Sequence, residues 1–164
     1  MDAAKIPVAR FETQGAWDWD GEVTVIVYRP DGEALVDVFH NTITNDARFM
    51  VAHALSGAAV DLRIKYVALG DDDTTPTSSD HALGSEKYRR AVADYSYPAT
   101  ASVKTTTSVP ASEATGFTIK EIGWFAGPTA TASADSGVLV ARVLYTRAKS
   151  ALEILQIDRT DTWS

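Results

Sequence analysis

The segment IKYVALGDDDTTPTSSDHALGSEKYRR, residues 64–90, joins an apolar pattern to an acidic run and then to a cationic one. Its first six residues predict a β-strand that ends at Gly70. Residues 71–79 are polar and interrupted by proline, which predicts a loop and excludes a regular helix or strand. The segment therefore contains either a metal or phosphate site of an enzyme, or a connector in a protein that assembles with others.

A β-hairpin is predicted upstream of this segment. Residues 22–29 (EVTVIVYR) and 34–40 (ALVDVFH) are rich in β-branched and aromatic residues. The intervening RPDGE sequence is typical of a turn, because proline presets φ and glycine accepts a positive φ.

One amphipathic helix is predicted between the hairpin and the acidic segment, within residues 41–59. Thr44 or Asn45 is suited to cap its start, and Gly57 to mark its end. Its apolar stripe is expected to cover one face of a sheet. The stripe consists of Ala47, Met50, Val51, Ala54, Leu55 and Ala58.

The rest of the chain is typical of successive strands separated by Gly, Pro, Ser and Thr. Asp80 is expected to cap a short helical turn. The sequence thus predicts a mainly β fold, a two-layered antiparallel β-sandwich with one amphipathic helix. The whole chain, residues 1–164, is expected to form a single domain: an amino-terminal arm (1–21), the hairpin (22–40), the helix (41–59) and the sandwich core (64–164). The strands are expected at 88–97, 101–108, 117–125, 138–145 and 152–159, with a flexible hairpin tip at 127–137.

Composition limits the partners. The chain has 22 acidic and 15 basic residues and a net charge of −7, whereas binding to phosphate backbones needs a basic surface. No cysteine is present, and no segment has the pattern of a signal peptide or a membrane span. We therefore expect no nucleic-acid or membrane partner, and a protein that is made in the cytoplasm and kept or assembled there.

The acidic segment is the candidate metal site of the sequence. Carboxylates of the acidic segment offer oxygen ligands to a cation such as Ca²⁺, but their spacing does not match an EF-hand loop. A solvated acidic loop is the favoured interpretation, and cation binding at Asp71–Asp73 stays open. Because no nucleophile elbow, phosphate-binding glycine loop or paired histidines are present, we expect no enzyme, no cofactor and no metal site.

Tryptophans are the candidate interface residues. If the segment WDWD is extended, Trp17 and Trp19 lie on one side and are able to stack on sugar rings or on a partner subunit. The alternative is that they fasten the amino-terminal segment across the sandwich. Trp163, near the end of the sequence, is expected to be buried by a neighbour, and Trp124 is added as a possible contact.

Four motifs in a fixed order carry a family resemblance, which covers the chain from about Asn41 onward. They are VALG at 67–70, the D-x-A-L-x-x-E pattern at 80–86 followed by Arg89 and Arg90, I-x-E-x-G-x-F at 119–125, and L-x-A-R at 139–142. In this order the sequence resembles small virion structural proteins of tailed phages and related prokaryotic viruses, akin to the amino-terminal domains of tail-collar fibre proteins. The hairpin and WDWD segment are less typical of that family.

The resemblance implies a virion protein assembled in the host cytoplasm. It implies an oligomeric adaptor of the tail, baseplate or collar, or the base of a head turret or fibre. Its partners would be copies of itself, in a ring or trimer, and other virion proteins. The alternative is a carbohydrate-binding module for host surface glycans that uses Trp17, Trp19 or Trp124. A small hydrolase is a third possibility, for which the sequence shows no convergent pocket.

Glu121 is the one charged site that the residues themselves single out. It lies between Ile119 and Ile122 in an otherwise apolar strand. A carboxylate buried there requires a cation. We therefore predict a structural ion pair of Glu121 with Arg142 or Arg90.

Overall fold

The computed structural model describes residues 18–58 and 60–164, which form ten strands and one helix. The strands are β1 (Trp19–Tyr28), β2 (Ala34–His40), β3 (Thr42–Ile43), β4 (Ile64–Gly70), β5 (Glu86–Ala91), β6 (Asp94–Ser96), β7 (Ser102–Val109), β8 (Thr118–Ala126), β9 (Val138–Ala148) and β10 (Ile154–Trp163), and the helix is α1 (Asn45–Leu55).

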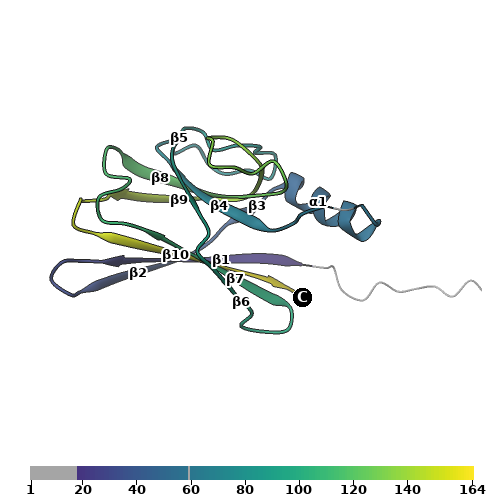
Figure 1. Cartoon of the computed structure of the whole chain (residues 1–164), viewed down its shortest axis with the longest axis horizontal. Helices are drawn as coiled ribbons and strands as arrows, with labels where there is room; N and C mark the ends of the chain where they lie inside the picture. The colour runs from purple at the N-terminus through teal and green to yellow at the C-terminus, as the bar shows by residue number, and fades with distance from the viewer. Residues whose placement is uncertain (1–17, 59) are drawn as a thin grey trace, which may run out of the picture.

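Two antiparallel five-stranded sheets lie face to face (Figure 1). Sheet A has the strand order β2-β1-β10-β7-β6, and sheet B has the order β3-β9-β8-β4-β5. The main apolar core lies between the sheets and includes residues of both, such as Val25 of β1 and Trp124 of β8. The predicted mainly β, two-layered sandwich with one helix is confirmed.

The hairpin is an integral part of the sandwich. β1 lies between β2 and β10 in sheet A, and its side chains Val23, Val25 and Val27 are fully buried. The expectation that the sandwich core begins only at residue 64 is therefore wrong, because alternate residues of β1 supply part of the inner face. Most of the predicted arm, residues 1–17, lies outside the described residues, and β1 already begins at Trp19.

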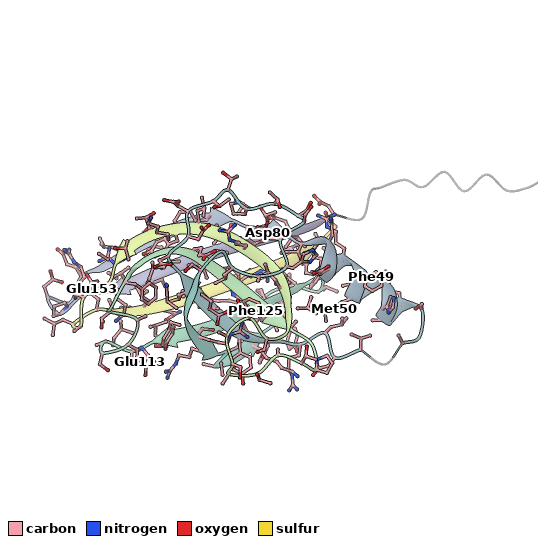
Figure 2. The ribbon with its side chains drawn as sticks, turned by 90° about the horizontal axis from the view of Figure 1, so that it is seen from above. Phe49, Met50, Asp80, Glu113, Phe125 and Glu153 are labelled. Atoms are coloured by element: carbon pink, nitrogen blue, oxygen red, sulfur yellow. The ribbon has the colours of Figure 1, made fainter. Side chains whose placement is uncertain are left out.

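The helix caps one end of the sandwich instead of covering a sheet face. Thr44 accepts a hydrogen bond from the Ala47 amide at the start of α1, and Gly57, with φ of +89°, follows its last turn. Only Ala47 and Met50 of α1 are buried, and Figure 2 shows the helix extending past the sheets. This helix of 11 residues is not long and apolar enough to cross a bilayer.

Two further expectations are wrong. The single strand predicted over 88–97 is two strands, because the chain leaves sheet B after β5 and pairs with β7 of sheet A as β6. Asp80 does not cap a helical turn; instead its carboxylate accepts hydrogen bonds from the backbone and side chain of Thr77.

Sheet B is covered on its outer face as well. Ile122 and Trp124 point into the main core, whereas Phe125 packs on the other side in a second cluster with Ala68, Leu83 and Leu139. Leu83 belongs to the loop between β4 and β5, so this loop forms a partial third layer. A strand buried on both faces has a nearly continuous apolar sequence, as EIGWFA does.

Candidate functional site

A buried ion pair joins two neighbouring inner strands of sheet B. Nε of Arg142, on β9, donates to Oε2 of Glu121, on β8, at 2.7 Å. The two side chains are 3% and 0% exposed, respectively. Arg142 is thus one of the two cations expected beside Glu121.

The same network fastens the acidic loop. The remaining guanidinium nitrogens of Arg142 donate to Asp80 and to Asp72, each at 3.1 Å. The carboxylate of Glu121 also accepts the backbone N–H groups of Gly84, at 3.0 Å, and Ser85, at 2.8 Å. Since each of the three guanidinium nitrogens donates to a carboxylate and both oxygens of Glu121 accept hydrogen bonds, the buried charges are well satisfied.

Two glycines make room for this network. A Cβ atom at Gly70 would lie 2.2 Å from Oε1 of Glu121, and one at Gly84 would lie 2.3 Å from the carboxyl carbon of Asp72. Real Cβ atoms do not approach other heavy atoms so closely. The VALG ending of β4 therefore ends in glycine because Glu121 occupies the neighbouring space.

The three consecutive aspartates contact three different cations. Asp71 lies 3.6 Å from Nζ of Lys87, Asp72 pairs with Arg142, and Asp73 lies 3.1 Å from Nζ of Lys120. They diverge because consecutive side chains do not share a direction. Within the described residues, no group of three or more acidic, histidine or cysteine side chains is arranged to hold a metal ion. The three carboxylates of this loop are therefore already paired with basic side chains of the protein.

Electrostatics favour the charged forms of Asp72, Asp80 and Arg142. Hydrogen bonds from Thr74 and the charge of Arg142 lower the pKa of Asp72. Burial disfavours ionised Asp80, but hydrogen bonds from Thr77 and Arg142 outweigh it and lower its pKa too. Burial likewise opposes charge on Arg142, yet its bonds to Glu121 and Asp80 raise its pKa.

The alternative that Arg90 pairs with Glu121 is wrong. Its guanidinium donates to Glu113 at 2.9 Å, in the loop before β8. Alternation along β5 decides this, because neighbouring residues of a strand point to opposite faces.

Sequence reasoning missed Arg89, which is buried in a bidentate pair with Glu86 at 2.7 and 2.8 Å. Its guanidinium carbon lies 4.0 Å from the ring centroid of Phe125, and it donates to the backbone oxygen of Ser136 at 2.7 Å. These contacts hold the segment 127–137 against β5, where a flexible tip was expected. Spacing gave no signal for this pair, because Glu86 and Arg89 both lie in β5 and residues three apart in a regular strand point to opposite faces.

The four tryptophans, which were the candidate interface residues, lie in different surroundings. Trp124 is fully buried, with its ring 5.3 Å from the guanidinium carbon of Arg159, so its assignment as an interface residue is wrong. Trp19 and Trp163 are partly buried and lie side by side, with ring centroids 5.7 Å apart, on the paired strands β1 and β10. Trp17 lies outside the described residues.

Among the described surfaces, the one best suited to contact another chain is the β2 edge of sheet A. β2 pairs with β1 alone among the described strands, and all but one of its seven residues are exposed. On the outer face of this edge lies an apolar group that we call the β2 patch. It consists of Tyr28, Val36, Val38 and Ile154, which are 41–58% exposed.

A long apolar edge strand invites pairing with another chain, and natural proteins usually protect such edges. The only charged residue within β2, apart from the terminal His40, is Asp37, which the register places opposite Val25 and so on the inner side. The outer side of β2 is left without a charge to oppose a neighbour.

Comparison of the chain with protein-family models, curated proteins and solved structures found no match.

We predict that Glu121→Gln lowers the free energy of unfolding by about 2–4 kcal/mol, because it leaves the buried guanidinium short of one charge partner. Thermal denaturation followed by circular dichroism measures the effect. The matched control is Glu33→Gln, which breaks an exposed ion pair with Arg29 and should cost less than about 1 kcal/mol. Equal melting temperatures for both variants would contradict a stabilising role for the network.

The lowered pKa values of Asp72 and Asp80 predict a specific acid sensitivity. In the unfolded chain these groups bind protons near their ordinary value of 3.8, and in the folded protein only at lower pH. Their stabilisation is therefore complete well above pH 3.8 and is lost as the pH falls through the folded values. The double variant Asp72→Asn/Asp80→Asn should be less stable at neutral pH and lose less on acidification.

Urea denaturation at a series of pH values measures this difference. Asp94→Asn, an exposed change on β6, is the control and should follow the parent protein. A double variant whose acid dependence parallels that of the parent would contradict the assignment.

Proposed function

We propose that this protein is a non-enzymatic structural component of a virus particle, which assembles with copies of itself and with other particle proteins. Its place would be an adaptor of the tail, baseplate or collar, or the base of a head turret or fibre. The observation that carries the proposal is the open, apolar β2 edge of sheet A. The assignment to a virus particle is supported by the resemblance of the sequence to virion structural proteins.

The geometry of sheet A favours a head-to-tail contact. Its two edges are β2, with seven residues, and β6, with three exposed residues. A neighbour that adds to β2 through a different surface of its own makes a heterologous contact, which generates a closed ring when the rotation per copy allows it. Backbone hydrogen bonds along β2 would set the register, and burial of the β2 patch would supply most of the association energy.

The rigid loops support a role in assembly. The ion network and the Arg89 pair hold the long connections against sheet B, where they do not obstruct the outer face of sheet A. A pre-organised surface loses little conformational entropy when it binds. Glycan recognition is less well supported, because Trp124, one of its three proposed contacts, is buried in the core.

We predict that Val38→Lys abolishes or strongly weakens self-association, because it places a charge within the apolar β2 patch. Sedimentation velocity and light scattering over a range of protein concentrations measure the oligomer. The matched control is Ser108→Lys, an exposed residue on the outer face of β7, two strands away from β1. A parent protein that stays monomeric at high concentration, and labels no virus particle in electron micrographs, would refute the proposal.

A further inference from the structure

A cavity of about 700 Å³ opens at the α1 end of the sandwich, far from the hairpin end that carries the β2 patch. Glu153, in the connection between β9 and β10, and Phe49 of α1 mark these two ends in Figure 2. The cavity lies between α1 and both sheets. Its walls are mostly apolar and aromatic and include Met50, Ile64, Val140, Trp19, Tyr97 and Trp163.

The cavity has a polar contact that the described residues do not complete. Asp161 of β10 lines it and is fully buried. Its Oδ1 accepts a hydrogen bond from Nε1 of Trp19 at 2.7 Å and another from Arg159, whereas its Oδ2 has no partner among the described residues. Nε1 of Trp163 is also buried without a partner in the described part of the chain. Buried polar groups in this state favour an occupant that brings hydrogen-bonding groups with its apolar surface.

Residues 1–17 are joined to the described chain at the rim of this cavity. The backbones of Asp18 and Ser164 are paired by two hydrogen bonds, at 2.9 and 3.1 Å, so the chain enters β1 at the rim, beside Trp19. At roughly 3.3 Å per extended residue, the preceding segment spans up to ~55 Å. In its sequence Ile6, Val8 and Arg10 alternate with other residues, which gives an extended segment one face with two aliphatic groups and a cation.

We propose that the cavity binds residues 6–10 of a second copy of this chain. Ile6 and Val8 match the apolar walls, and Arg10 matches the incomplete hydrogen bonding of the Asp161 carboxylate. A second copy is favoured because Asp18, through its pairing with Ser164, continues the line of β1 at the rim of the cavity and does not turn into it. The proposal rests on the self-association inferred above and names a second contact for it, at the opposite end of the molecule.

The test uses disulfide trapping in the full-length chain, which contains no cysteine of its own. A Val8→Cys variant with an enlarged tag is mixed with a Leu62→Cys variant, whose cysteine lies on the cavity wall, and mild oxidant is added. We expect a mixed covalent dimer on non-reducing gels. The matched control replaces Leu62→Cys with Leu152→Cys, an exposed position in the connection at the other end. It should give several-fold less product.

Two further sets of variants make the result decisive. Adding Asp161→Asn to the cavity variant should slow cross-linking several-fold, provided that circular dichroism shows it folded. Adding Val38→Lys to both partners separates the two contacts: cross-links that persist would support arm binding even where the β2 contact is lost.

Either of two results would overturn the proposal. One is a mixed dimer that forms no faster than with the Leu152→Cys control. The other is a Val8→Cys/Leu62→Cys double variant that closes within one molecule at high dilution, since the arm would then occupy its own cavity.

Discussion

The outer layer of sheet B depends on one guanidinium, that of Arg142, which holds three segments of chain that are distant in sequence. It bridges Glu121 of β8 and, through Asp72 and Asp80, both ends of the acidic loop. Charges removed from water in this way are tolerated only when each has a partner, and losing one partner strands the others. The close approach also requires glycine at Gly70 and Gly84, so a few residue identities determine the whole outer layer of sheet B.

This layer explains why the two sides of the sandwich differ. Loops anchored by Arg142 and Arg89 cover the outer face of sheet B, so its strands are buried on both sides. Within residues 18–58 and 60–164, no loop covers the outer face of sheet A in this way, and the β2 patch is exposed at its edge. The proposed contacts, at the β2 patch and at the cavity beside α1, lie at opposite ends. This arrangement suits repeated head-to-tail association better than a single paired dimer.

Short sequence patterns correctly predicted the features that depend on neighbouring residues. The hairpin, the Thr44 cap and the sandwich class follow from β-branched runs, turn residues and capping, and the need of Glu121 for a cation follows from its apolar neighbours. What failed depends on three-dimensional packing. The break between β5 and β6 carries no Gly, Pro or Asn/Gly turn signal, because the chain changes sheets there. The depth of Trp124 and the choice of Arg142 over Arg90 depend on which face of a strand meets the core, which spacing alone does not reveal.

Hydrogen exchange at two backbone amides tests the role of the ion network most directly. Gly84 and Ser85 lie in a loop, but their N–H groups donate to the buried carboxylate of Glu121. If the network holds this loop on sheet B, both amides exchange about as slowly as those of β8, because exposing them requires the buried ion cluster to open. Exchange as fast as that of the exposed turn between β1 and β2 would contradict it, since the loop would then move independently of Arg142.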